Sequence, residues 1–408
     1  MTAGSSMRLC ILAPEFLPIW GGVGTYTVEL VRHLPKNFEV HVVAPMRKSI
    51  GTSKTSTFDY DLSEYFSENV HVHFVSSASD TFFYNAAFQY ACMRFVPKLV
   101  KDVGIDLIHS HTAHMPDLLL PLRRLRIPTV TTVHTTIQGQ RQGSKQSGEH
   151  FRNLDLSEKM TYIGYPILRV AEELYFLRKI DYITVSNWMK RQLLAHFSHI
   201  RRSNVRVIHN SVDTRFFTPG ESEDNRKIVL FTGRLIAAKG LTYLTDAIPQ
   251  VLEDYPDTLF TFIGPGNPSI YRSRLLRRGV PRKNYIFLGY LKSWKDILTW
   301  YRKCAIFVAP TLYENLPIRI LEAMACAKPV VATNVCAIPE AVTSHENGIL
   351  VPSMSSKALA EAICSLLEDP EVRLQLGRAA RKKVVEEFDW TANANYTTSF
   401  YEEVLNAS

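Results

Sequence analysis

The sequence contains few cysteines, and they follow no pattern that would make them act together. There is no Cys-x-x-Cys pair and no pairing of cysteine and histidine at metal-ligand spacing. A disulfide scaffold or a zinc finger is therefore not predicted, and a reducing, cytoplasmic setting is the simplest interpretation. The six cysteines are Cys10, Cys92, Cys304, Cys326, Cys336 and Cys364.

Long apolar runs are also missing. Nowhere do roughly 18 apolar residues follow one another, so no transmembrane helix is predicted. The N-terminus lacks a charged leading region, and Pro14 and Glu15 interrupt its apolar stretch, which is atypical of a secretory signal. We expect a soluble protein, or one that is peripheral at the inner face of a membrane.

Excess acidic charge is absent, and the net charge of +8 is unevenly distributed. Residues 1–212 hold 24 Lys and Arg against 17 Asp and Glu, whereas the remainder holds 23 against 22. A basic half attracts an anionic membrane or a phosphorylated substrate, although an ordinary solvated surface explains the excess equally well. The cations are spread out without interleaved aromatic residues, so nucleic acid is not expected as a partner.

With 408 residues, of which 46% are hydrophobic, the chain is long enough for two globular domains. Short β-branched runs alternate with longer amphipathic ones, a pattern typical of parallel α/β architecture. In the first half this predicts strands at 8–13, 39–44, 70–74, 106–109, 129–133, 182–185 and 205–208. Helices are predicted between them at 25–34, 85–101, 116–125, 157–179 and 187–196.

A Pro- and Gly-containing charged stretch at 209–227 interrupts this alternation and is typical of an interdomain linker. A second series follows, with strands predicted at 228–232, 259–263, 285–288, 305–309, 329–332 and 349–351. The chain is thus predicted to form two tandem Rossmann-like domains. Ligands of such sheets bind at the carboxyl ends of the strands, so we expect the site in the cleft between the domains.

Residues 137–150 depart from the pattern because they are polar and nearly free of apolar anchors. This composition predicts a mobile loop. The loop follows a predicted strand end, where a substrate lid is useful, but a disordered insertion fits equally well.

A glycine cluster, Gly21, Gly22 and Gly24, lies between the first predicted strand and the helix that follows. Glycines there let the backbone approach a ligand and expose helix N-terminal amides to an anion. The spacing is GGxG rather than GxGxxG, and no acidic residue ends the second strand, so the NAD fingerprint fails. A plain tight turn is the alternative.

Two cations, Arg234 and Lys239, follow the first strand of the second half by a few residues. A planar guanidinium fork and a compact ammonium together suit a diphosphate. Taken alone they would be two surface cations. His134 also ends a predicted strand, a position that favours function, and His109 and His111 end the preceding one; we expect His109 to be structural.

Two glutamates flank the start of another predicted helix. Glu314 lies in the loop before it, Pro317 is expected to be its first residue, and Glu322 lies inside it. Eight helical residues would separate the carboxylates by about 12 Å, the scale of a nucleotide ligand. Several roles remain open for this pair. The carboxylates could accept hydrogen bonds from sugar hydroxyls or act as paired glycosidase carboxylates. They could also be a solvated helix residue and a charge that complements the helix dipole.

Taken together, these motifs resemble the family 4 glycosyltransferases, retaining enzymes with the two-domain B-type fold. The similar stretches cover almost the whole chain: GGVGTYTVEL, DLIHSH, HNSVD, GRLIAAKG, FIGPG, IFLGYL, LEAMA and KPVVAT. The resemblance implies domains at 1–212 and 213–388, which bind acceptor and donor, and a C-terminal helix at 389–408 that crosses back to the first domain.

The resemblance also implies roles for individual residues. Arg234 and Lys239 would bind the donor diphosphate in place of a metal or other cofactor, and Glu322 would hold the ribose. His134 and Glu314 would position the transferred hexose. The remaining donor contacts would come from Gly21, Gly22, Leu288, Gly289, Asn315, Leu316 and Ile318. The expected reaction moves a hexose from a UDP- or GDP-sugar to a glycan, lipid-linked or phosphorylated acceptor.

Three positions depart from the family pattern. Ala327 replaces a usual glycine, which suggests that this turn does not need positive φ. Leu316 and Pro317 replace glycine-containing residues at the helix start, and Pro317 removes an amide donor. Ser211 also stands where glycine is common.

Two other functions compete with transfer. A catalytically silent nucleotide-sugar binding protein would be expected to lack Arg234, Lys239 or Glu322, and all three are present. A nucleotide-sugar isomerase or epimerase on the same fold would turn over the donor alone.

Overall fold

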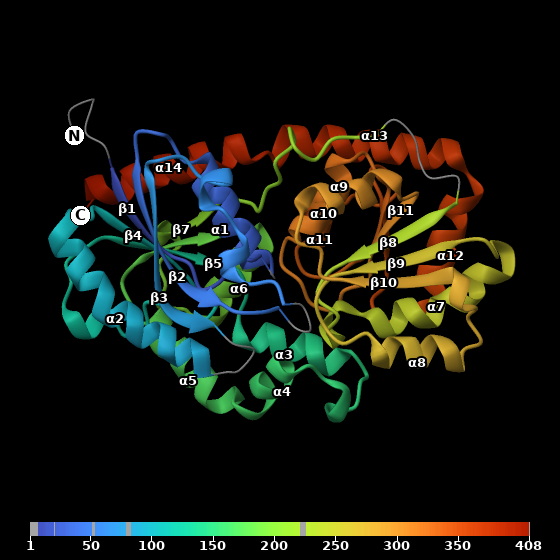
Figure 1. The fold of residues 1–408 in the computed structure, drawn as a ribbon, viewed down its shortest axis with the longest axis horizontal. Coiled ribbons are helices and arrows are strands. Elements are labelled where there is room, and N and C mark those ends of the chain that lie inside the picture. Colours follow the sequence, from blue (N-terminus) through green and yellow to red (C-terminus); the bar gives the residue numbers. More distant parts are fainter. Residues whose placement is uncertain (1–6, 20, 51–53, 79–82, 221–225, 408) are drawn as a thin grey trace.

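The computed structural model describes residues 7–19, 21–50, 54–78, 83–220 and 226–407. These residues form two lobes, each built on a parallel sheet (Figure 1). The first sheet has the order β3-β2-β1-β4-β5-β6-β7. Its strands are β1 (Arg8–Leu12), β2 (Glu39–Arg47), β3 (Val70–Ala78), β4 (Leu107–His111), β5 (Thr129–Val133), β6 (Asp181–Thr184) and β7 (Val205–Val207).

The second sheet has the order β10-β9-β8-β11-β12-β13. In both parallel sheets the order of the strands reverses beside the first strand, between β1 and β4 and between β8 and β11. This is the arrangement of a doubly wound fold. The predicted fold class is therefore confirmed. The strands are β8 (Ile228–Thr232), β9 (Leu259–Ile263), β10 (Tyr285–Gly289), β11 (Ile306–Ala309), β12 (Val330–Thr333) and β13 (Ile349–Val351).

Helices connect these strands and cover the sheets (Figure 1). In the first lobe they are α1 (Gly22–His33), α2 (Phe83–Val103), α3 (Ile137–Gln146), α4 (Leu156–Ile163), α5 (Tyr165–Phe176) and α6 (Asn187–His196). Later in the chain they are α7 (Leu241–Asp254), α8 (Ser269–Arg277), α9 (Trp294–Lys303), α10 (Ile318–Ala325), α11 (Ile338–Ala341), α12 (Ser356–Glu368), α13 (Pro370–Glu387) and α14 (Trp390–Ala407).

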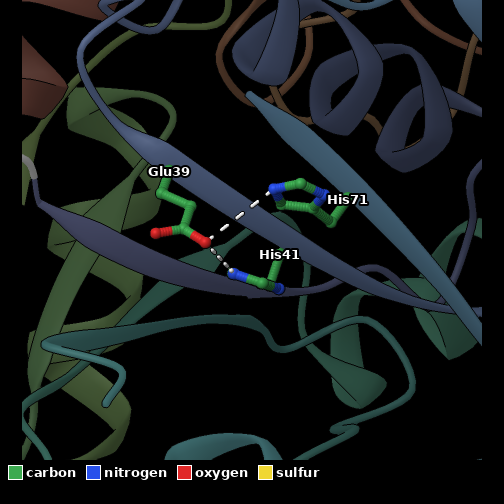
Figure 2. A group of neighbouring side chains, drawn as sticks. All are labelled: Glu39, His41 and His71. Atoms are coloured by element: carbon green, nitrogen blue, oxygen red, sulfur yellow. Dashed lines mark hydrogen bonds and ion pairs between the residues drawn. The ribbon is translucent and has the colours of Figure 1, made fainter. Parts of the chain in front are cut away.

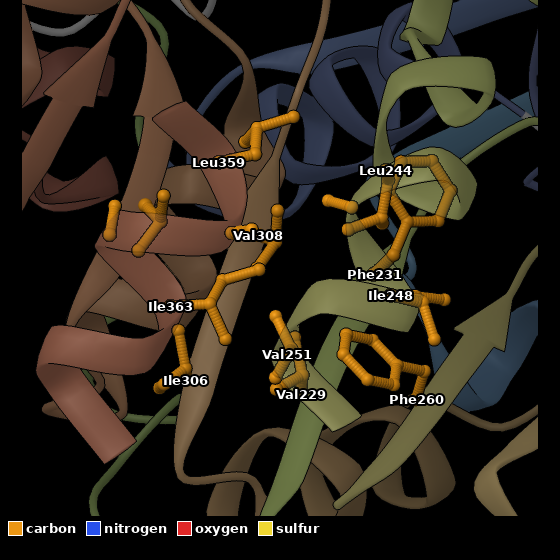
Figure 3. Packing of buried hydrophobic residues seen from close by; sticks show 14 of the residues in the cluster. Val229, Phe231, Leu244, Ile248, Val251, Phe260, Ile306, Val308, Leu359 and Ile363 are labelled. Atoms are coloured by element: carbon orange, nitrogen blue, oxygen red, sulfur yellow. The ribbon is translucent and has the colours of Figure 1, made fainter. Parts of the chain in front are cut away.

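Each lobe has its own apolar core, built around central strands such as β4 and β8 that are buried on both faces. In the second lobe β8 and α7 supply Val229, Phe231, Leu244 and Ile248 to one cluster (Figure 3). Phe262 and Phe287 stack within that cluster with ring centroids 4.4 Å apart. Burial of such side chains stabilises the fold by roughly 2 kcal/mol each. The rigid sheets thereby fix the positions of the loops at their carboxyl ends.

The last helix, α14, returns to the first lobe as expected (Figure 1). Trp390 is fully buried against Tyr26 of α1, and the Tyr401 hydroxyl hydrogen-bonds the buried His109 ring. Ser211 also faces this helix, since its hydroxyl accepts from the Asn393 amide at 3.1 Å. The expected structural role of His109 is confirmed, and Ser211 has a contact that glycine would lack.

Three sequence-based expectations about helices are wrong. At 116–125 only a 3-10 turn forms (Leu120–Arg123), because Pro121 lacks the N–H that a longer helix needs. The helix expected at 157–179 is interrupted at Gly164, which separates α4 from α5. Pro317 precedes α10 with ψ of 119°, so it caps the helix instead of starting it.

The segment predicted as a mobile loop at 137–150 also differs, because most of it forms α3. Thr136 caps this helix by accepting a hydrogen bond from the Gly139 N–H at 3.2 Å. We call residues 137–163, which include α3 and α4, the arm. No helix within the described ranges combines the length and apolar character required to cross a bilayer.

The turn after α10 contradicts the expectation drawn from Ala327, whose φ is +55°. The Lys328 N–H donates to the Ala323 carbonyl and the Ala327 N–H to the Met324 carbonyl, at 3.0 and 2.9 Å. This pair of bonds is a Schellman motif, which places the residue after the C-cap in the left-handed region. The turn therefore imposes positive φ whichever residue occupies it.

We predict that Ala327→Gly stabilises the protein by about 1 kcal/mol, because glycine adopts positive φ without the penalty of a Cβ. Ala323→Gly, the same substitution inside α10, should instead destabilise by about 1 kcal/mol or more. Urea unfolding of the two variants beside the wild type checks both signs. Destabilisation by Ala327→Gly would contradict this account of the turn.

Candidate donor site between the two lobes

Polar side chains from both lobes meet where the carboxyl ends of the two sheets approach each other. The Asn315 side-chain amide, from the loop after β11, donates to the His134 carbonyl at the end of β5, at 3.1 Å. The Ser186 hydroxyl before α6 donates to the Asn315 side-chain oxygen. The predicted site residues of the two lobes are thus brought together by direct contacts.

The two predicted donor cations follow β8 and both face carboxylates. Lys239, in a 3-10 turn (Ala237–Lys239), donates from Nζ to Glu314 Oε2. The Arg234 guanidinium lies 2.9 Å from Ser157 Oγ and 3.4 Å from Asp155 Oδ1, both on the arm. Burial lowers the pKa of Lys239 to about 7, and repulsion from nearby guanidinium groups acts in the same direction.

A third cation, Arg319, belongs to this cluster and was missed by the sequence analysis. Arg319 stands in the first turn of α10, and its guanidinium reaches the backbone of Gly233, next to Arg234. Burial lowers its pKa, while Tyr301 and Glu322 oppose that shift. A positive charge in the first turn of a helix opposes the macrodipole. An arginine in the first turn of a predicted helix is therefore the sequence signal that could have identified Arg319.

The two glutamates occupy different surroundings. Glu314 is held by Lys239, whereas Glu322 accepts a hydrogen bond from the Tyr301 hydroxyl at 2.6 Å. Tyr301 also bonds Thr232 at 2.8 Å, so Glu322 is tied to the end of β8. Burial raises the pKa of Glu322, with Tyr301 and Arg319 opposing. The expected contacts of Glu322 with ribose and of Glu314 with the hexose stay predictions.

His134 is buried and neutral at the end of β5. Its Nε2 lies 3.0 Å from His111 Nδ1, and its ring packs edge-on against Tyr26 at 4.8 Å. Burial lowers the pKa of His134 to about 4, although the charge of Glu15 opposes this. Burial likewise lowers the pKa of His111. Both imidazoles are therefore uncharged at neutral pH.

The glycine loop ends at α1, with Gly21 at the N-cap and Gly22 as the first helical residue. A carboxylate already uses an amide there, since Gly24 N–H donates to Glu15 Oε2 at 3.2 Å. Burial by itself raises the pKa of Glu15, but His114 and Arg234 lower it overall. A Cβ on Gly21 would lie 2.5 Å from the same carboxylate oxygen, so a side chain there would require Glu15 to move.

The remaining predicted donor contacts divide into two groups. Leu288 and Gly289 end β10, and no atom lies within 4 Å of where a Gly289 Cβ would stand, leaving room beside this backbone. Leu316 and Ile318 have buried side chains. The Leu316 carbonyl accepts from the Asn210 amide at 2.6 Å, and Ile318 packs in a core cluster of the first lobe. The Leu316 carbonyl and the Ile318 side chain thus join the lobes.

The arm forms a second bridge between the lobes. The Glu158 carboxylate accepts from the N–H groups of Ala237 and Ala238, at 3.3 and 3.1 Å. Gly139 and Gly143, one helical turn apart on α3, face Tyr313, and a Cβ on Gly139 would lie 1.9 Å from its ring. The absence of a side chain at these two glycines lets α3 approach the second lobe closely, which polarity alone did not indicate.

A hollow of about 490 Å³ lies between the stretch that joins α3 to α4 and helices α7 and α8, lined in part by Glu149, Asp246 and Arg274. Another of about 320 Å³ lies between the linker and α14. The predicted donor residues line neither of these two hollows.

Comparison with known proteins places the two lobes in one class of enzyme. The family described as Glycosyltransferase Family 4 matches residues 20–216, and that described as Glycosyl transferases group 1 matches residues 226–369. Together with the doubly wound fold, these two matches define a glycosyltransferase with two Rossmann-like domains. The chain belongs to the family 4 glycosyltransferases with the B-type fold.

Relatives that match most of the chain agree with this assignment. Alpha-maltose-1-phosphate synthase of Mycolicibacterium smegmatis is 26% identical and covers 98% of this chain and 100% of its own. D-inositol 3-phosphate glycosyltransferase of Corynebacterium glutamicum is 28% identical over 78% of this chain and 77% of its own.

Solved structures share the fold at lower identity. Sucrose-phosphate synthase of Thermosynechococcus elongatus is 19% identical with a TM-score of 0.80, covering 98% of this chain and 100% of its own. HepE of Anabaena, solved with UDP and glucose, is 18% identical with a TM-score of 0.72, covering 97% and 99%.

The buried histidines generate a pH prediction. When the pKa of a histidine is lower in the folded state than in the unfolded state, the unfolded state binds its proton at a higher pH. The free energy of unfolding therefore falls as the pH drops below about 6.5. For His134, with a folded pKa of about 4, the loss between pH 6.5 and 5 is about 2 kcal/mol. Urea unfolding at several pH values should show a flatter profile for His134→Gln. An unchanged slope would contradict the buried neutral ring.

Proposed function

We propose that the protein is a retaining, metal-independent hexosyltransferase that uses a UDP- or GDP-linked sugar. The observation that carries this proposal is the convergence of Arg234, Lys239 and Arg319 at the carboxyl end of β8 and the start of α10. Two or three fixed cations suit a nucleotide diphosphate. The structural relative HepE was solved with UDP-glucose, which supports a donor of this class.

In the proposed reaction the bond between the anomeric carbon and the donor phosphate oxygen breaks while the acceptor hydroxyl oxygen bonds to that carbon. The acceptor proton passes to a phosphate oxygen on the same face, so configuration is retained. Charge grows on the departing diphosphate, and the three cations stabilise it most in the transition state. Lys239 exchanges Glu314 for a phosphate, which frees Glu314 for the hexose hydroxyls.

The site lies between the lobes, and both competing functions use the same donor contacts. An isomerase or epimerase converts the nucleotide sugar without an acceptor, and a silent binding protein converts nothing. Incubation with the bound nucleotide sugar alone, followed by analysis of the sugar, separates the first from transfer. We propose transfer because a relative named as a glycosyltransferase matches 78% of this chain.

Calorimetry with UDP, GDP, ADP and their hexose conjugates, in buffer containing EDTA, tests the donor class. One diphosphate should bind, and Lys239→Ala should weaken it by about tenfold or more, since a charged hydrogen bond is lost. Lys357→Ala is the matched control, because that lysine is 80% exposed on α12. If none of the nucleotides binds, or if Lys239→Ala binds as tightly as the control, the proposed donor site is wrong.

For the acceptor we propose a lipid-linked or phosphorylated hydroxyl compound presented at an anionic membrane. Five aliphatic side chains, at spacings of three or four residues along the end of α4 and along α5, are each more than half exposed. They are Ile163, Ile167, Val170, Leu174 and Leu177. An exposed apolar stripe on an amphipathic helix suits the interface of a bilayer.

Charge beside this stripe favours an anionic surface. Residues 178–202 contain six Lys and Arg against one Asp. His199 Nε2 bonds the Phe176 carbonyl at 2.8 Å, which brings the exposed Arg201 and Arg202 close to the end of α5. Apolar insertion and attraction to anionic lipid headgroups then act at one place.

Sedimentation with phosphatidylcholine vesicles, with and without phosphatidylglycerol, checks the membrane contact. The wild type should bind the anionic vesicles, and Ile167→Ser with Leu174→Ser should lose most of that binding. Leu276→Ser, at an equally exposed leucine of α8, is the control. If the double variant loses a concentration-dependent dimer while vesicle binding is unchanged, the stripe joins two copies of the chain and the proposed membrane contact is wrong.

A further inference from the structure

A cluster of three histidines and one glutamate occupies the first sheet at the end opposite the donor site. Glu39 and His41 are the first and third residues of β2, and His71 and His73 lie near the start of β3. His41 and His71 are register partners, so the alternation of strand side chains places all four on one face. Figure 2 shows Glu39, His41 and His71 converging there.

Histidine ring nitrogens from the two strands lie near the same carboxylate oxygen. His41 Nε2 lies 3.2 Å from Glu39 Oε1, and His71 Nε2 lies 3.8 Å from the same atom. One ligand atom from each of the three residues falls within 4.8 Å of the others. Tetrahedral zinc, with bonds of about 2.0–2.1 Å, spaces its ligand atoms by about 3.3 Å. Glu39 and His41 already have this spacing, and His71 needs only a small movement.

The surroundings of His41 resemble those of a metal-bound imidazole. Its Nδ1 lies 3.1 Å from His73 Nε2, and the two rings stack with centroids 5.4 Å apart. An imidazole that binds a metal through Nε2 usually donates its Nδ1–H to such a second partner, which fixes the ring and its tautomer. His41 is only 5% exposed, so the surrounding residues hold its ring in place.

The accessible part of the cluster lies on its outer side. The His71 side chain is 46% exposed and that of Glu39 is 39% exposed, so an ion reaches them from solvent and a water completes the coordination. The neighbouring cation Arg8 is engaged elsewhere, since its guanidinium donates to the Val103 carbonyl and pairs with Asp106.

We propose that Glu39, His41 and His71 form a zinc site that joins the edge strand β3 to β2, with His73 as the residue that orients His41. Two imidazoles and one carboxylate favour Zn²⁺ over Mg²⁺ or Ca²⁺, which prefer oxygen ligands. The site stands at the amino ends of the strands, away from the candidate donor site. This inference does not rest on the proposed transferase reaction.

A second group, Glu29, His33 and Asp213, also brings three ligand atoms together. There the Arg32 guanidinium lies 2.7 Å from Glu29 Oε1 and repels a bound cation. The cluster on β2 and β3 is therefore the better site.

Zinc titration of the full-length, chelator-treated protein tests the proposal by calorimetry and thermal unfolding. The wild type should bind one Zn²⁺ through this cluster and unfold at a higher temperature with zinc than without it. His71→Ala and Glu39→Gln, both at partly exposed positions, should lose binding and the temperature shift. His73→Phe keeps a ring beside Phe95 and should weaken zinc binding by roughly 10- to 100-fold.

His196→Ala is the matched control, because His196 is exposed and bonds only its own helix at the Gln192 carbonyl among the contacts described. It should bind zinc as the wild type does. Absence of zinc binding by the wild type, or equal binding by His71→Ala, would overturn the proposal. Nucleotide binding by the chelator-treated protein tests the donor site separately. If that binding is lost, the metal-independent donor site is contradicted, whereas the zinc titration still decides the zinc site.

Discussion

Three buried or half-buried cations lie at the carboxyl end of the second sheet, and the surrounding structure has to compensate their charge. Arg234, Lys239 and Arg319 repel one another, and their burial costs hydration free energy. Carboxylates compensate in part: Glu314 holds Lys239, and Asp155 from the other lobe approaches Arg234. Such a cluster is stabilised further by an anionic ligand, which is the physical reason to expect a diphosphate at this place.

The same cluster explains why the lobes contact each other through polar groups. Glu158 of the arm accepts two amide protons beside Lys239, and Asn315 spans from the Glu314 loop to the end of β5. These bonds are directional, and they hold the loops that carry His134 and Glu314 beside the cations. Apolar contacts add to them, since Ile318 packs in a core cluster of the first lobe.

Much of this architecture follows from local sequence signals. Apolar strands that alternate with amphipathic helices predicted both sheets, and the strand-end positions of Arg234, Lys239 and His134 predicted that they would converge. The predicted loop at 137–150 failed for a specific reason. The prediction rested on polar composition, whereas Gly139 and Gly143 face Tyr313 of the other lobe, a contact to which polarity gives no clue.

By itself the sequence determined the order of the elements, the two-sheet fold and most of the charged groups near the candidate donor site, because these depend on periodicity and on short motifs. Only the tertiary structure decided which distant residues share a surface. Arg319 joins two other cations through the fold, and Glu39 and His41 meet His71 across paired strands. Ala327 takes positive φ because the hydrogen bonds of its turn impose it. Contacts between residues far apart in sequence depend on strand order and register, which no local pattern specifies.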